Sequence, residues 1–349
     1  MKKIDFLNFM MFIVSPFMAI PSIIVGVIKR SKFSLFLLIL MFGLVSYMYI
    51  PHYSNDRARY FEVYEDFVNL SFEEMFSFFF LNNQDFILQS LFYFASQIEI
   101  PAQLVFASVT MVTVSIIFFI YYRIIDRFTI NNTYGLLSLI IIFLSISYLD
   151  LLSGTRFMFA ASFVLLGYYL GIIEKSKWAI LFLILATFIH FSVLIFIPIF
   201  LFLRFFSSSN NFCKIIFFFS FFFLFLPKEV LYSIFDFLGL GGALKEKSNI
   251  YLNEDDFITA GLSGSNSDGG HIIYYISILN LFSTYLYLMI THKKVGVYRN
   301  IVLIIASVIN LFYSVPTVFL RYALFFKMLF AFMLVYELYI HKNKKIITT

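Results

Sequence analysis

Residues 102–122 read AQLVFASVTMVTVSIIFFIYY and carry no charged side chain. A helix of this length rises about 30 Å, which is the thickness of the hydrocarbon core of a bilayer. Further apolar runs lie near 6–28, 33–50, 133–151, 157–173, 271–291, 300–320 and 322–340. Hydrophobic residues make up 61% of the 349-residue chain and charged residues 13%, so lipid is its main solvent. The sequence predicts an all-α, polytopic integral membrane protein with about 9–11 transmembrane helices.

The charges between these runs are sorted by sign. Lys and Arg occupy the short connectors near 29–32, 123–127, 175–177, 204–214, 293–299 and 342–345, whereas most Asp and Glu fall in the longer loops 51–85 and 236–271. Positively charged connectors remain in the cytoplasm, so the two acidic loops should face outward. We therefore expect a single transmembrane domain over residues 1–349 with two outward-facing loops.

The segment 178–203 is flanked by basic connectors at both ends. It must therefore leave the cytoplasmic side and return, as two short helices or a re-entrant hairpin with His190 near the outer tip. A lone His in an apolar segment is often a packed structural residue. An ionisable group within a membrane segment is, however, also a candidate for a site, and His titrates near neutrality.

The remaining composition excludes several classes of function. The single Cys213 permits no internal disulfide, and the five His residues form no HxxH or HExxH pair. The chain also lacks a GxGxxG motif and a P-loop. We expect no metal, no cofactor and no nucleic-acid partner.

Four arginines stand at the edges of apolar runs on the side where basic residues should be scarce, namely Arg57, Arg59, Arg156 and Arg321. An Arg beside hydrocarbon is costly and is normally retained for a partner. Its planar fork of donors suits phosphate or carboxylate. These arginines therefore predict an anionic ligand at the outer face.

Arg156 follows a tight turn that begins at Asp150 and includes Gly154. The turn should place Arg156 at the outer mouth of a helix, where the first amides add to the positive field. The alternative is an arginine that extends to the headgroups or pairs with Asp150. Arg321, at the turn between the last two runs, repeats the same pattern.

The stretch 56–64 places Asp56, Tyr60 and Tyr64 four residues apart. If it is helical, one face carries a carboxylate and two phenols, which is a common way to hold hydroxyl-rich ligands. The alternative is an interfacial amphipathic helix with Tyr at headgroup depth.

Several of these motifs occur together in one known family. The matching positions, between about residues 45 and 325, are Asp56-x3-Tyr60-x3-Tyr64, Gly154-Thr155-Arg156-Phe157 with Ala160, Ala186-Thr-Phe-Ile-His190-Phe-Ser192 with Pro198, and Arg321. In this succession the chain resembles the EpsG-like and Wzy-like polysaccharide polymerases. It departs from the usual pattern at Asp56-Arg57-Ala58-Arg59, where many relatives have a Gly before the Asp and one upstream Arg. This leaves open whether Arg57 or Arg59 has that arginine's role.

The resemblance implies a membrane glycosyltransferase with a GT-C-type architecture in the bacterial inner membrane. It would join oligosaccharide repeat units carried on undecaprenyl pyrophosphate at the periplasmic face, for O-antigen, capsule or exopolysaccharide. The implied catalytic residues are Arg156, His190, Arg321 and Asp56, and the implied substrate-binding residues are Arg57, Arg59, Tyr60, Tyr64 and Asp150. The implied partners are the lipid-linked substrate, membrane lipid, a chain-length regulator and a flippase.

Two other functions remain open from the sequence. A membrane O-acyltransferase that modifies a surface polysaccharide would also use an Arg and a His, although near the start of the chain, and the first 51 residues contain no His. A flippase for the lipid-linked unit should show more broken helices and internal repeats in a longer chain.

Overall fold

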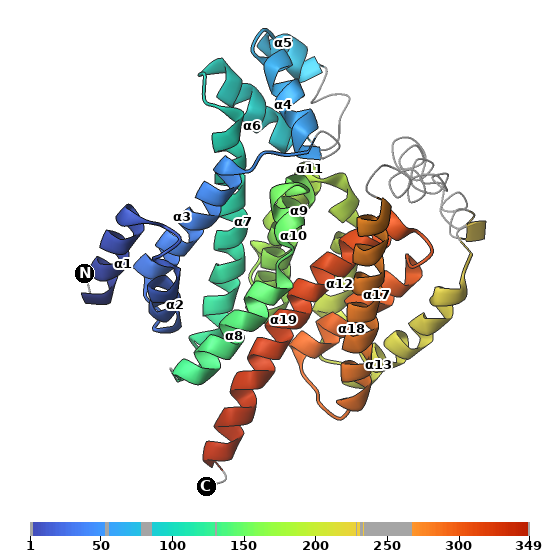
Figure 1. The fold of residues 1–349 in the computed structure, drawn as a ribbon. Helices are drawn as coiled ribbons and strands as arrows, with labels where there is room; N and C mark the ends of the chain where they lie inside the picture. The colour runs from blue at the N-terminus through green and yellow to red at the C-terminus, as the bar shows by residue number, and fades with distance from the viewer. Residues whose placement is uncertain are drawn as a thin grey trace. The chain divides into compact units, whose positions relative to one another are not determined.

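The computed structural model describes residues 3–52, 56–77, 86–129, 131–227, 229–230, 233 and 267–347. All regular elements in these ranges are helices (Figure 1). The chain is thus all-α, as the apolar runs predict. The helices are α1 (Lys3–Val14), α2 (Ile20–Ile28), α3 (Lys32–Met48), α4 (Asp56–Phe67), α5 (Phe72–Met75), α6 (Ile87–Gln97), α7 (Ala102–Ile125), α8 (Asn132–Ser145), α9 (Tyr148–Leu152), α10 (Thr155–Tyr168), η2 (Tyr169–Ile173), α11 (Ala179–Ile189), η3 (Phe191–Ile195), α12 (Phe196–Phe206), α13 (Asn210–Phe219), η4 (Ser220–Phe225), α17 (Ser267–Ile290), α18 (Val297–Leu311) and α19 (Pro316–Ile347).

The apolar helices fall into two length classes. Within the described ranges, three stretches are long and apolar enough to cross a membrane, namely Ala102–Ile125, Thr155–Ile173 and Val318–Ile340. The same ranges hold eight further apolar helices of 10–17 residues. Together they confirm a polytopic membrane protein.

The apolar run 6–28 does not form the single helix that we expected. It is divided into α1 and α2, with Pro16 in the connection and Pro21 in the first turn of α2. Proline lacks an amide donor and its ring clashes with the preceding turn, so a continuous helix is disfavoured here. The two helices pack against each other and against α3. Gly26 permits this approach, because a Cβ there would lie 2.0 Å from the hydroxyl oxygen of Ser34.

The described part of loop 51–85 contains α4 and α5, and α6 follows it. Helix α6 is not predicted by the apolar runs or motifs of the sequence. Most of loop 236–271 lies outside the described residues, and the last residues of that loop begin α17.

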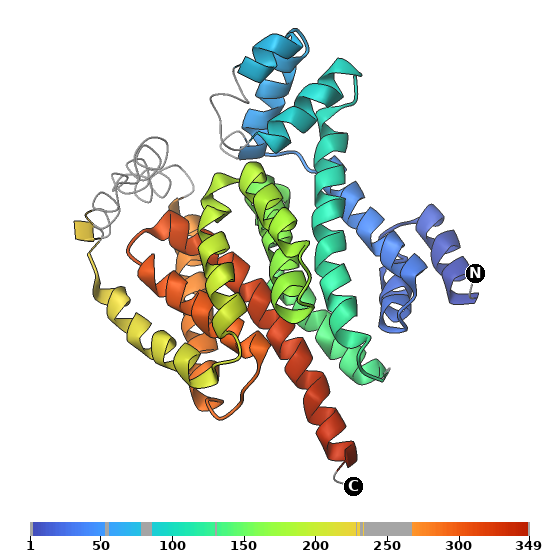
Figure 2. The same ribbon diagram turned by 180° about the vertical axis from the view of Figure 1, so that it is seen from behind.

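The chain divides into two compact units, and each is described by itself. The first comprises Met1–Leu201 with Leu334–Thr349, and the second comprises Phe202–Met333. In the first unit α7 packs along both α3 and α10, and α10 packs along α11. Figure 2 shows these helices from behind. The expectation of one transmembrane domain stays a prediction.

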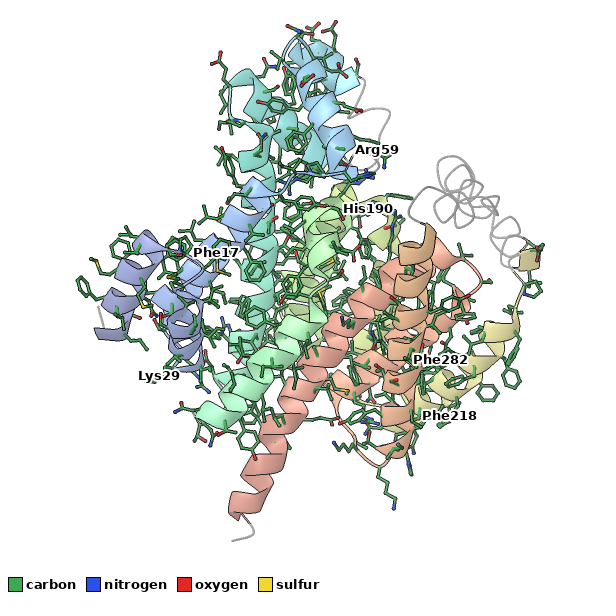
Figure 3. The ribbon with its side chains drawn as sticks, in the orientation of Figure 1. Phe17, Lys29, Arg59, His190, Phe218 and Phe282 are labelled. Atoms are coloured by element: carbon green, nitrogen blue, oxygen red, sulfur yellow. The ribbon has the colours of Figure 1, made fainter. Side chains whose placement is uncertain are left out.

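Two basic connectors of the first unit, near 29–32 and 123–127, meet at one end. The Arg30 guanidinium donates to the carbonyls of Ile125 (2.6 Å) and Phe128 (2.8 Å) and lies 3.5 Å from the Asp126 carboxylate. The Phe128 ring stacks on Tyr339 at 5.3 Å. Figure 3 shows Lys29 at this end and Arg59 and His190 toward the other. That this end is cytoplasmic stays a prediction.

The second unit contains a buried polar chain. The Tyr285 hydroxyl donates to Asn310 Oδ1 (2.7 Å), and Asn310 Nδ2 donates to the Ser220 hydroxyl (2.8 Å). All three residues are buried. This chain ties α17 and α18 to the start of η4.

Candidate functional site

The turn before α10 is built from local hydrogen bonds. The Ser147 side chain caps α9 by accepting from the Asp150 amide (3.5 Å), and its hydroxyl donates to the Asp150 carboxylate. Gly154 then precedes α10, and a Cβ at Gly154 would lie 3.3 Å from the Asp150 carbonyl oxygen. Arg156 is therefore the second residue of α10. This confirms the prediction that it stands at the mouth of a helix, where amides lack intrahelical partners.

An aromatic ring from α4 lies against this arginine. The Arg156 guanidinium carbon is 5.9 Å from the centroid of the Tyr60 ring, which is within the range of a cation–π contact. Tyr60 is itself held by Phe92, on which it stacks at 5.4 Å, and by the edge contact with Phe106 at 6.2 Å. The position of the ring over Arg156 is thus fixed by α6 and α7.

Arg57 lies one turn before Tyr60 and is fully buried, with 0% of its surface exposed. Its guanidinium donates to the Ser46 hydroxyl (3.2 Å), the Ser46 carbonyl (2.5 Å) and the Leu152 carbonyl (3.2 Å). The guanidinium carbon also lies 4.2 Å from the Phe106 ring centroid. Burial lowers the pKa of Arg57 to about 10, because the charged form loses water, and it remains protonated at neutral pH.

The two tyrosines of α4 share one face, as the four-residue spacing predicts. The Tyr64 ring meets Phe92 edge-on at 6.3 Å, and the Tyr64 hydroxyl donates to the carbonyl of Ile100 (2.6 Å). Burial, and secondarily the charge of Glu99, raises the pKa of Tyr64. Asp56 begins α4, but its side chain lies outside the described residues. That this stripe holds sugars stays a prediction.

His190 lies at the tip of a helical hairpin, as the charge pattern predicts. It directly follows α11 as its C-cap, and the chain then returns through η3 and α12. Both arms pass Gly171, since a Cβ there would lie 2.7 Å from Ala179 Cβ and 2.4 Å from the Phe200 ring. The Tyr168 hydroxyl also donates to the Phe196 carbonyl (2.8 Å) on the returning arm. The segment 178–203 therefore turns back at His190.

The hairpin brings His190 to the same end of α10 as Arg156. The imidazole is 6% exposed and lies 6.0 Å, centroid to centroid, from the ring of Phe157, the residue after Arg156. The structure thus gathers Arg57, Tyr60, Arg156 and His190 from three separate regions of the sequence. Arg59 is exposed and lies toward the same end of the first unit (Figure 3). Asp150 is half-buried in the turn before α10.

Arg321 belongs to the second unit and is described by itself. It lies near the start of α19 and is half-buried. The next residue, Tyr322, packs edge-on against Phe312 at 5.4 Å. The predicted catalytic role of Arg321 stays a prediction.

Sequence reasoning missed the residues that hold Arg57. Ser46 lies inside an apolar run, and its hydroxyl also accepts a hydrogen bond from Thr110 of α7 (2.9 Å). Isolated hydroxyls in two apolar runs are the only signal that the sequence offers. Among the described residues, no group of three His, Cys, Asp or Glu side chains could hold a metal ion.

Comparison with known proteins identifies the family. The model of the EpsG family matches residues 52–349, which covers most of the chain and begins after α3. No curated protein and no solved structure matches the chain. On the strength of that match, and of the apolar helices described above, the chain is a membrane protein that belongs to the EpsG family.

Proposed function

We propose that this protein is a membrane glycosyltransferase that polymerises lipid-linked oligosaccharide repeat units. The observation that carries the proposal is the grouping of Arg156, Tyr60 and His190 at one end of α10. Membership of the EpsG family supports the same function. The substrate would be an oligosaccharide on undecaprenyl pyrophosphate, destined for O-antigen, capsule or exopolysaccharide.

The reaction would transfer a glycan to a hydroxyl of a second lipid-linked unit. The acceptor oxygen forms a bond to the anomeric carbon while the bond from that carbon to the pyrophosphate oxygen breaks. Negative charge then develops on the leaving pyrophosphate. Preorganised guanidiniums stabilise such charge without a metal, which suits Arg156 beside the first amides of α10.

The proton of the acceptor hydroxyl needs a destination. His190 would take it as a general base or would orient the hydroxyl by a hydrogen bond, and Asp56 is the other candidate. Arg321 would assist the leaving group, while Arg59, Asp150, Tyr60 and Tyr64 would bind substrate. The site would face the periplasm from the bacterial inner membrane, with a flippase and a chain-length regulator as partners.

The test is deletion of the gene followed by gel analysis of the surface polysaccharide. Loss of a polymerase leaves single repeat units attached to the surface carrier. Loss of a flippase would leave none, and loss of an acyltransferase would leave full-length chains without acyl groups. Either of the last two patterns would overturn the proposal.

A further inference from the structure

The Arg57 guanidinium joins the ends of two helices. Ser46 lies in the last turn of α3, and Leu152 is the last residue of α9. Carbonyls in the last turn of a helix lack the usual amide partner four residues later, so they can accept a hydrogen bond from a side chain. The Ser46 carbonyl also accepts from the Tyr49 amide (3.3 Å). Arg57 donates to both carbonyls and to the Ser46 hydroxyl. One side chain of α4 thus fastens α3 and α9 together.

The same side chain is closed off from any ligand. None of its surface is exposed, and aromatic rings of Phe106 and Tyr49 lie 4.2 Å and 5.3 Å from its guanidinium carbon. An anion that reached Arg57 would have to displace these rings and break the hydrogen bonds to carbonyls. Arg59, two residues later on α4, is exposed.

The Leu152 carbonyl connects Arg57 to Arg156. It also accepts from the hydroxyl of Thr155 (3.3 Å), the first residue of α10, which directly precedes Arg156. The other end of Arg156, its guanidinium, lies over Tyr60, one turn after Arg57 on α4. Helix α4 therefore contacts both the backbone before Arg156 and its charged group.

We infer that Arg57 is a positioning residue, which holds the α9–α10 turn against α4 and so sets Arg156 under the Tyr60 ring. Arg59 is then the arginine of this pair that can meet an anionic ligand. Arg57 acts on the reaction through Arg156 and does not touch substrate. The inference rests on the proposed function only where polymer is the readout.

A first experiment needs no assumption about function. Ser153, in the α9–α10 turn, is replaced by Cys in a Cys213→Ser background, and the rate of maleimide labelling is measured on the full-length protein in membranes. Arg57→Ala should raise the labelling rate about tenfold or more, because the α9–α10 turn should open more often. Lowering the free energy of opening by about 1.4 kcal/mol raises the population of the open turn tenfold. Arg59→Ala is the matched control and should leave the rate unchanged.

Unchanged labelling in Arg57→Ala would overturn the inference, whatever the protein's activity. If that variant does not reach the membrane, Arg57→Lys is measured, because one ammonium cannot span the two carbonyls that the fork joins. Ser46→Ala removes one acceptor without changing charge and should raise the rate by a smaller factor. Labelling at the wild-type rate in both Arg57→Lys and Ser46→Ala would also overturn the inference.

A second experiment uses polymer formation. Arg57→Ala should reduce the rate of polymerisation by about 100-fold, because misplacement of Arg156 by about 1 Å can cost that much. Arg156→Ala should reduce this rate by about 100-fold because it removes the charged donor. If Arg57 acts through Arg156, the double variant should be no worse than Arg156→Ala alone. Losses that multiply would show that Arg57 contacts substrate independently. The control is the double variant Arg59→Ala with Arg156→Ala. Its loss of polymerisation rate should equal the product of the losses in the two single variants.

If wild-type protein makes no polymer while labelling of the Ser153→Cys protein still responds to Arg57→Ala, the proposed function fails and the positioning role stands. If polymer forms and labelling does not respond, the positioning role fails and the proposed function stands. The two failures are thus distinguishable.

Discussion

Arg57 and Arg156 are both cations beside aromatic rings, but their surroundings differ. The donors of Arg57 are directed to neutral protein acceptors in a closed interior, whereas Arg156 lies half-buried at a helix N-terminus. The burial of Arg57 favours a structural role, whereas the free amides at the start of α10 favour anion binding at Arg156. Two arginines that look alike in the sequence thus suit different tasks.

Arg156 should be required for polymerisation. Arg156→Ala should cost about 2–4 kcal/mol of transition-state stabilisation, which is typical for loss of a charged donor in a site of low dielectric constant. Arg156→Lys should rescue poorly because an ammonium lacks the planar fork. The measurement is chain length on gels at equal membrane abundance. Arg123→Ala is a matched control, since the Arg123 guanidinium carbon lies 5.2 Å from the Phe119 ring centroid in the last turn of α7.

Normal chain length in Arg156→Ala would reduce that residue to an interfacial anchor. Shortened chains in Arg123→Ala would show instead that any lost cation–π contact weakens the protein.

His190 should act in proton transfer or in hydrogen bonding. His190→Asn keeps one hydrogen bond, and His190→Ala keeps none, so loss of polymer in both supports a base. Activity in the Asn variant alone would indicate positioning. Phe157→Leu controls for the lost ring contact at 6.0 Å and should retain polymer. Full activity in His190→Ala would show that the imidazole only packs.

Among the elements, the hairpin of α11 and α12 could be predicted from the sequence. The division between α1 and α2 could not be predicted from hydropathy. The hairpin follows from charges at both ends of 178–203, which are local facts. Hydropathy averages over Pro16 and Pro21, so run 6–28 looked continuous. The Arg57 contacts depend on the approach of α3, α4 and α9, and no spacing of Ser46 and Leu152 encodes that approach.

Close packing at Gly171 should hold both arms of the hairpin against η2. Gly171→Ala places a methyl group where Phe200 and Ala179 already lie, at 2.4 and 2.7 Å. Overpacking of this kind costs about 1–3 kcal/mol. We expect a lower midpoint of thermal unfolding in detergent. Phe200→Leu combined with Gly171→Ala should recover part of the loss, because it vacates the ring position. A double variant no better than Gly171→Ala would contradict this packing argument.

For the whole molecule, the sorting of charge predicts how the chain lies in the membrane. The end of the first unit with Arg30 and Lys29 should be cytoplasmic, and the end with Arg59 and His190 should be periplasmic.

The test of this topology uses single cysteines in a Cys213→Ser background. Glu73→Cys, exposed on α5, should react with an impermeant maleimide once the outer membrane is permeabilised. Lys29→Cys should react only after the inner membrane is broken. The opposite pattern would place the Arg156 site in the cytoplasm, where lipid-linked units are not yet exported, and would overturn both the topology and the proposed periplasmic reaction.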